Sequence, residues 1–232
     1  MCQRLPFPAL PTLLRTLWLA LLLSLLSLLP VRPAAAQDWE QVAAGMLQRP
    51  EFEALPLQIL PPRGQSLGGS PVEMQFQSGQ CLLKLRTRGN PVAEWLLAQA
   101  QPEDRTLWMQ AVLVHEIAHC WRWQQAHDPS LQQLATLMAS PGARTDAAVA
   151  RQVQRQLGQE EAFADVVALA WVAGAAPQRF EAILQAFQRL RSDPRLSAGP
   201  HDTRAALQRV QREGIPTGRS VFVLASTLLQ AP

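Results

Sequence analysis

Alternating apolar and polar residues mark a short region as extended chain. Every second residue from 72 to 76 is apolar, in the order Val, Met, Phe, and a second extended run follows at 81–85. Between them stand Ser78 and Gly79, which favour a tight turn. In a strand with one buried face, every second side chain points to that face. Two such runs joined by a tight turn predict a β-hairpin.

The chain before this hairpin contains few periodic stretches. A short helix is predicted at about 38–47, and prolines at 56, 61 and 62 then interrupt any regular element. The Gly- and Ser-rich stretch 64–70 is typical of a loop. We therefore expect the rest of residues 37–70 to be irregular.

From Pro91 onward the composition shifts to Ala, Leu, Gln and Arg, which favour helix. Proline and glycine divide this region into five or six predicted helices, at positions 102, 141, 142, 158, 177, 194 and 200. One long helix is predicted from Pro102 to about Gln125, and another from near Gln159 through the apolar stretch 163–172. The chain is therefore expected to be α+β and predominantly helical, with a small N-terminal hairpin or sheet.

The first 36 residues have the features of a secretory signal peptide. Two arginines give a basic start, residues 17–29 form an apolar run of 13, and three alanines at 34–36 offer a cleavage site. The alternative is an uncleaved membrane anchor, but the run is shorter than the roughly 20 residues that span a bilayer, and Pro30 ends it. We predict export, cleavage after Ala36, and a mature chain without a stable membrane span.

Removal of this leader changes the charge of the chain. Of 232 residues, 196 remain, enough for one domain with a sizeable core, which we place at 37–232. Three basic residues leave with the leader, so 18 Lys and Arg stand against 18 Asp and Glu. No basic stripe remains that could bind phosphate groups, which argues against a nucleic-acid partner.

The mature chain has two cysteines, Cys81 and Cys120, because Cys2 leaves with the leader. In an oxidising compartment they can form a disulfide. The alternative is a pair of small buried hydrophobic side chains, which is how free cysteines usually behave. The sequence leaves both open.

The long predicted helix carries the sequence HEIAH, in which His115 and His119 lie one turn apart on one face. Two imidazoles with that spacing can bind one Zn²⁺, while Glu116 between them can act on a water molecule as a general base. The alternative is an ordinary polar helix face. Against this alternative, the helix also carries the apolar residues Leu107, Ala111, Val112 and Val114, which indicate that it is substantially buried. Two histidines and a glutamate would be costly in a buried helix without a metal.

A catalytic zinc site commonly has three protein ligands. The longer motif HExxHxxGxxH does not fit, because Arg122 and Gln125 stand where it needs glycine and histidine. His127 is too far along the helix to join the same ion unless the helix ends and folds back. Glu161 is the better candidate, since it and Asp165 are four residues apart and so share one face of the next strongly apolar helix.

HExxH on one helix followed by ExxxD on another resembles the gluzincins, the branch of zincin metallopeptidases that includes thermolysin. The resemblance covers two motifs within about residues 105–172, and is greatest to small secreted bacterial metallopeptidases. It implies a zincin-like fold and a peptide or protein substrate. It also implies that Glu161 is the third zinc ligand and that Asp165 holds a ligand histidine in its metal-binding tautomer.

Glu160 remains an alternative ligand. A simpler interpretation is that Glu160 and Glu161 only favour the positive end of a helix dipole and bind nothing. Asp165 argues against it, because this residue stands in a run of Ala, Val, Leu and Trp, where an unpaired carboxylate would be costly.

A peptidase also needs a donor for the oxyanion of its transition state. The chain has no tyrosine, and beyond HEIAH its imidazoles are His127 and His201. His201 stands in the sequence Pro-His-Asp-Thr-Arg, which resembles a segment of several zinc peptidase families and implies a catalytic role for His201 or Arg204. Asp202 is equally typical of a helix N-cap.

These features together predict a zinc-dependent peptidase that acts outside the cytoplasm. By resemblance to zincins, the edge of the hairpin would bind extended peptide, although a hairpin can equally be scaffold. Two other classes stay open. A zinc-binding envelope assembly or chaperone factor would keep the fold without activity, and a structural helical protein would carry HEIAH only as a polar face.

Overall fold

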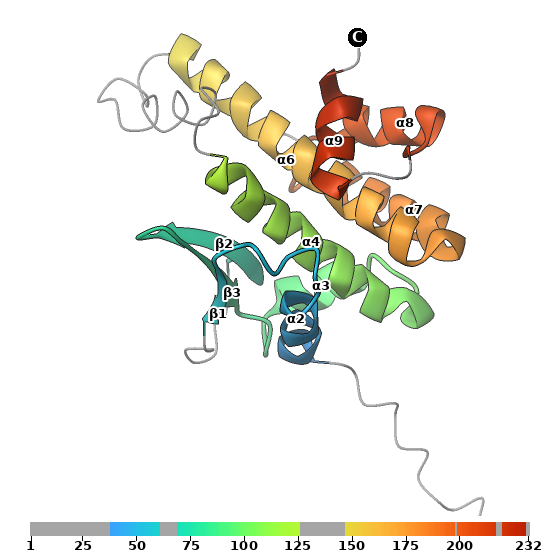
Figure 1. Ribbon diagram of the computed structural model, residues 1–232. Coiled ribbons are helices and arrows are strands. Elements are labelled where there is room, and N and C mark those ends of the chain that lie inside the picture. The colour runs from blue at the N-terminus through green and yellow to red at the C-terminus, as the bar shows by residue number, and fades with distance from the viewer. Residues whose placement is uncertain (1–37, 61–68, 126–146, 198, 217–219, 231–232) are drawn as a thin grey trace, which may run out of the picture. The chain divides into compact units, whose positions relative to one another are not determined.

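The computed structural model describes residues 38–60, 69–125, 147–197, 199–216 and 220–230 (Figure 1). Within these ranges the chain is α+β and mostly helical, with one three-stranded sheet, which confirms the predicted fold class. The predicted signal peptide and His127 lie outside the described residues. None of the described helices is both long enough and apolar enough to cross a membrane.

The predicted hairpin is present. β2 (Val72–Gln77) and β3 (Gln80–Leu85) pair antiparallel, and the turn between them places Ser78 and Gly79 at φ 51° and 80°. Glycine adopts this left-handed backbone without strain, which suits the tight turn.

A third strand, β1 (Leu57–Leu60), pairs parallel with β3, so that β3 is central and β2 has one free edge. The prediction of irregular chain over residues 37–70 is wrong here. The strand has four residues between two prolines, which is too short a stretch to show a period of two.

One described helix precedes the sheet and six follow it. α2 (Trp39–Leu47) lies where it was predicted and begins at Asp38, whose side chain accepts a hydrogen bond from the Glu40 backbone N–H. The others are α3 (Pro91–Leu97), α4 (Arg105–Gln124), α6 (Ala147–Ala175), α7 (Phe180–Ser192), α8 (Arg204–Glu213) and α9 (Val221–Gln230). Short 3₁₀ turns at Pro102–Asp104 and Pro177–Arg179 lead into α4 and α7.

α6 begins earlier than the sequence suggested. The expected start near Gln159 is wrong, because the helix already runs from Ala147 and passes Gly158 without a break. A glycine inside a helix costs only about 1 kcal/mol relative to alanine, and most residues before it are good helix formers. Glu160 and Glu161 therefore lie inside a helix, and the dipole of a helix N-terminus does not explain them.

α4 is the element on which the others converge. It packs against α6 on one side and against β2 and α2 on the other, and Figure 1 shows it between the sheet and α6. Large side chains of α4 fill the core, among them Trp108, Leu113 and Ile117. Because both sides of α4 are covered in its middle part, His115 is buried there and Glu116 and His119 are only partly exposed.

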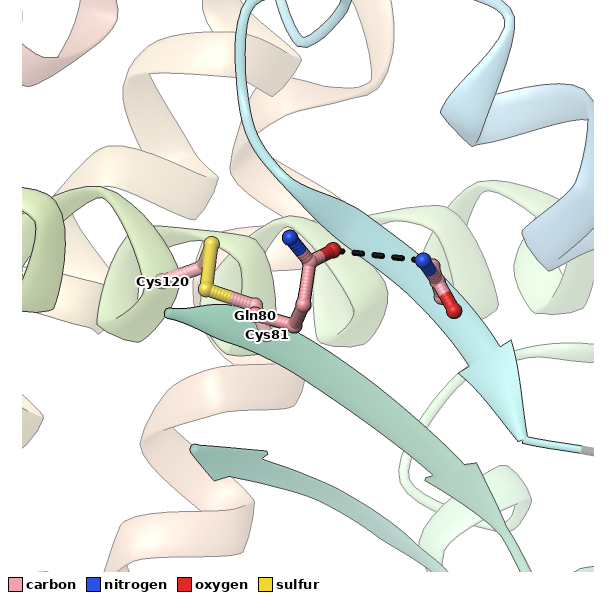
Figure 2. The surroundings of a disulfide bond; sticks show 4 residues. Gln80, Cys81 and Cys120 are labelled. Atoms are coloured by element: carbon pink, nitrogen blue, oxygen red, sulfur yellow. Dashed lines mark hydrogen bonds between the residues drawn. A yellow bond between two sulfur atoms is a disulfide. The ribbon is translucent and has the colours of Figure 1, made fainter. Parts of the chain in front are cut away.

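A disulfide joins Cys81 of β3 to Cys120 of α4 (Figure 2). Of the two possibilities that the sequence left open, the structure contains the bridge. Both cysteines are fully buried, and 39 residues separate them in the chain. The bond therefore ties the central strand of the sheet to α4 at the residue next to His119.

Candidate metal centre

Two neighbouring helices bring together side chains of the kinds that bind metals. His115 and His119 come from α4, and Glu161 comes from α6. Each offers one ligand atom, and these atoms all lie within 4.8 Å of one another. The structure thus gathers the three residues that were predicted as zinc ligands.

The spacing within this group suits a single tetrahedral ion. The Nε2 atoms of His115 and His119 are 3.2 Å apart, and carboxylate oxygens of Glu161 lie 3.5 and 3.6 Å from them. Zinc bonds of 2.0–2.1 Å in a tetrahedron place neighbouring ligand atoms about 3.3 Å apart. Two imidazoles and one carboxylate are also a donor set found in catalytic zinc sites. The residues present therefore fit the ion.

Glu160, the alternative ligand, has a different partner. Its two carboxylate oxygens accept hydrogen bonds from the guanidinium of Arg122, at 2.6 and 3.1 Å. Consecutive residues of a helix project about 100° apart, so only one of the two glutamates can face the histidines. In this structure it is Glu161.

Asp165, one helical turn beyond Glu161, contacts His115 from the other side of the ring. Its Oδ1 lies 2.9 Å from Nδ1 of the imidazole. A carboxylate in this position favours the tautomer with the proton on Nδ1, which directs the lone pair of Nε2 toward the ligand group. The predicted contact between this aspartate and a histidine of HEIAH is present.

Asp165 has two further partners that sequence reasoning missed. Arg191 of α7 donates to it at 2.8 and 2.6 Å, and the hydroxyl of Thr203 donates at 2.5 Å. Asp165 is 0% exposed and Arg191 only 5%. The sequence contains one indication that Arg191 has a buried partner. Arg191 stands four residues after Phe187 on the apolar face of an amphipathic helix, and a basic residue there needs an acidic partner.

Glu116 lies beside the ligand group and is held by the sheet. Its Oε2 accepts a hydrogen bond of 2.8 Å from the backbone N–H of Met74 in β2. Burial raises the pKa of this carboxyl from 4.5 to about 7, against the opposing charge of His115. A carboxyl group with a pKa near neutrality is suited to general base catalysis at neutral pH.

His201 reaches the group, whereas Arg204 does not. Nδ1 of His201 lies 2.9 Å from Oε2 of Glu161, and the side chain of His201 is 44% exposed. Arg204 is half exposed and pairs with Asp202, which also accepts a hydrogen bond from the Arg204 backbone N–H at the start of α8. The interpretation of Asp202 as the N-cap is wrong by one residue, because Thr203 holds the N-cap position of α8 and Asp202 precedes it.

The protonation states in the group depend on one another. Burial alone would lower the pKa of His115, but hydrogen bonds to Asp165 and Glu161 outweigh it and raise the pKa from 6.5 to about 10. Burial and the charge of His115 lower the pKa of His119 to about 4. Burial would raise the pKa of Asp165, yet Arg191 and His115 hold it at about 2. In the metal-free protein, a proton on His115 therefore supplies positive charge between two carboxylates.

Two cavities meet at this group. One, of about 350 Å³, is lined mainly by apolar side chains from α3, α4 and α7, including Trp95. The other, of about 650 Å³, runs along β2 and past the end of α4, where Phe76 and Trp123 line it. Glu116 and Glu161 belong to the walls of both, so the cavities form a cleft that passes the ligand group.

Comparisons with known proteins gave no match to a family model, to a curated protein or to a solved structure.

The two glutamates of α6 offer a matched pair of variants. Glu161→Gln should weaken zinc binding by about 100-fold or more, because it removes a charged ligand and not merely a supporting contact. Glu160→Gln should change it little, since Glu160 is bonded to Arg122. Competition with a chromophoric zinc chelator measures both affinities. Equal zinc retention in the two variants would rule out Glu161 as a ligand.

Zinc affinity should rise with pH. In the metal-free protein the pKa of His115 is raised to about 10, so the ion must displace a proton, and affinity should increase about tenfold per pH unit until the pH reaches about 10. The stability that this proton gives the metal-free protein is full below pH 6.5 and is lost as the pH rises through about 10. Thermal unfolding with and without zinc should therefore show a stabilisation that grows with pH. A zinc stabilisation that is the same at about pH 6.5 and about pH 8.5 would contradict this protonation state.

Proposed function

We propose that this protein is a zinc-dependent peptidase in which His115, His119 and Glu161 hold the ion and Glu116 is the general base. The observation that carries the proposal is the ligand group, in which one ligand atom from each of the three residues lies within 4.8 Å of the other two, where two cavities meet. A structural zinc site is closed by four protein ligands, whereas a catalytic site keeps one position open. A group of three ligands in the wall of a cleft favours the catalytic kind.

Zinc in this site would polarise a peptide carbonyl and lower the pKa of a water molecule. Glu116 would accept a proton from that water and later transfer it to the leaving amine. Its hydrogen bond from Met74 fixes the position of the carboxyl group in the cleft wall. Both tasks require a carboxyl group that takes up and releases a proton, and in the metal-free protein burial raises the pKa of Glu116 to about 7.

Two other residues have supporting roles in this proposal. His201 holds Glu161 through Nδ1 and lines both cavities, so its ring stands where it could donate a hydrogen bond to the developing oxyanion. Asp165, itself held by Arg191, keeps the ring of His115 in place. A zincin-like relationship is part of the same proposal and is supported by the HExxH helix beside an edge strand.

The substrate in this proposal is an extended peptide that lies along β2. β2 is an edge strand, and the N–H of Met74 points away from β3 toward Glu116, so the free edge of the strand faces the cleft. Strand addition to such an edge is a general way to bind peptides without regard to most of their side chains. Bound in this way, a peptide would pass the ligand group along its length.

We further propose that the protein acts outside the cytoplasm. The leader at 1–36 has the pattern of a signal peptide, and the Cys81–Cys120 disulfide is a bond that persists in oxidising compartments. The two features are independent of each other and support the same location.

Glu116→Gln should abolish most activity and leave zinc in place. The amide keeps nearly the same shape and can still accept the hydrogen bond from Met74, but it cannot take a proton, so hydrolysis should fall by roughly 10²- to 10⁴-fold. Zinc content by atomic absorption and cleavage of a randomised peptide library by mass spectrometry are the two measurements.

Glu73→Gln is the matched control, since Glu73 lines the same cleft but pairs with Arg86. It should keep activity within a few-fold of wild type. Full activity in Glu116→Gln would contradict the mechanism, and loss of zinc in that variant would make Glu116 part of the metal's support. One bound zinc without cleavage of any peptide by the wild type would favour a non-catalytic envelope assembly or chaperone factor.

The mature protein should begin at Gln37, because cleavage after Ala36 matches the three alanines that end the leader. Mass spectrometry of the N-terminal peptide from secreted or periplasmic material measures this directly. Recovery of intact Met1 from the membrane fraction would instead support an anchor.

A further inference from the structure

An exposed aromatic side chain lies at one end of the cleft. Val72, Met74 and Phe76 occupy alternate positions of β2 and share one face; the first two are buried, but Phe76 is 42% exposed. Among the described residues, Val223 on α9 is the other large hydrophobic side chain with such exposure. A single exposed apolar residue needs no explanation, but the surroundings of Phe76 set it apart.

Phe76 is half of a flat aromatic surface inside the cleft. Its ring stacks on that of Trp123 from the last turn of α4, with centroids 5.1 Å apart and planes inclined by 25°. Both rings line the cavity of about 650 Å³ that also contains Glu116, His119 and Glu161. We refer to Phe76 and Trp123 as the aromatic pair. It is therefore continuous with the candidate metal centre.

The chemistry around the aromatic pair is mainly apolar. Leu157 of α6 lines the same cavity. Charged residues outside the metal centre also line this cavity, but they are paired: Arg122 with Glu160 at 2.6 Å, and Glu73 with Arg86 at 2.9 Å. Such a wall favours a large apolar group over a charged one.

We propose that the aromatic pair is a specificity subsite, which binds a large apolar or aromatic side chain of an extended peptide in the cleft. This inference rests on the proposed function of the neighbouring metal centre and adds a substrate class to it. The bound ring would extend the stack of Phe76 and Trp123, which is a favoured arrangement of aromatic groups. Binding would also cover the part of Phe76 that the fold leaves exposed.

The position of Phe76 sets the position of the preferred residue. Phe76 is two residues along β2 from Met74, whose N–H contacts Glu116, and each residue of a strand advances about 3.3 Å. In the bound peptide, the preferred side chain should therefore lie about two residues away from the residue that is next to Glu116. It should lie on the side of the cleaved peptide bond that faces the end of α4.

Binding of peptides by zinc-loaded Glu116→Gln tests the subsite without turnover. A randomised peptide library is passed over the immobilised protein, and the retained peptides are sequenced. We expect enrichment of Phe, Trp, Tyr, Leu or Met at one position. Replacement of that residue by Ala in a retained peptide should weaken binding by about tenfold.

The matched variants are Phe76→Ala and Val223→Ala, both made in the Glu116→Gln background. Phe76→Ala should remove most of the tenfold preference, so that the peptide change and the protein change are strongly non-additive. Val223→Ala removes an equally exposed apolar side chain from α9 and should keep the preference. Phe76→Leu, which stays large and apolar, should restore part of it. Circular dichroism of each variant checks that the fold is retained.

The subsite and the peptidase can fail separately. Retention of no peptide, enrichment of no large apolar residue, or an unchanged preference in Phe76→Ala would each overturn the subsite. Cleavage by wild type without such a preference would leave the peptidase standing and remove the subsite. Binding that depends on Phe76, with no cleavage by wild type, would uphold the subsite and refute the peptidase.

Discussion

The carboxylate of Asp165 is completely buried and accepts hydrogen bonds from His115 of α4, Arg191 of α7 and Thr203 just before α8. An isolated ion in a protein core is very costly, and only well-placed partners offset that cost. Because the partners come from three segments besides α6 itself, these segments have to meet at one point. That requirement aligns α4 with α6 and thereby brings the histidines of one helix to the glutamate of the other.

The charges around this point explain why the group suits a divalent cation. Asp165 is a buried carboxylate, Glu116 and Glu161 are partly buried carboxyl groups beside it, and Arg191 is a buried cation that faces them. With all carboxyl groups ionised, a doubly charged ion brings the sum to zero. The raised pKa values of His115 and Glu116 have different causes: hydrogen bonds to Asp165 and Glu161 raise the first against burial, whereas burial raises the second.

Local rules account for what could be predicted from the sequence. The helical period alone places His115 and His119 on one face, and the position of Asp165 in an apolar run indicates a buried partner. Arg191 and Thr203 could not be paired with Asp165 beforehand, because tertiary packing alone brings them to it. The start of α6 was misplaced because Gly158 is a weak stop signal inside a sequence of strong helix formers. β1 was missed because four residues between two prolines are too short a stretch to show a period of two.

The bond between Cys81 and Cys120 also bears on how the cleft can move. It locks the central strand to α4 beside His119, while the Met74–Glu116 hydrogen bond joins the edge strand to the same helix. The disulfide and this hydrogen bond therefore restrain the sheet and α4 from moving apart. The opposite wall of the cleft, formed by α6 and the segment that carries His201, has no disulfide to α4 among the described residues. For the proposed peptidase, such a restrained wall favours a thin, extended chain over the surface of a folded protein as the substrate.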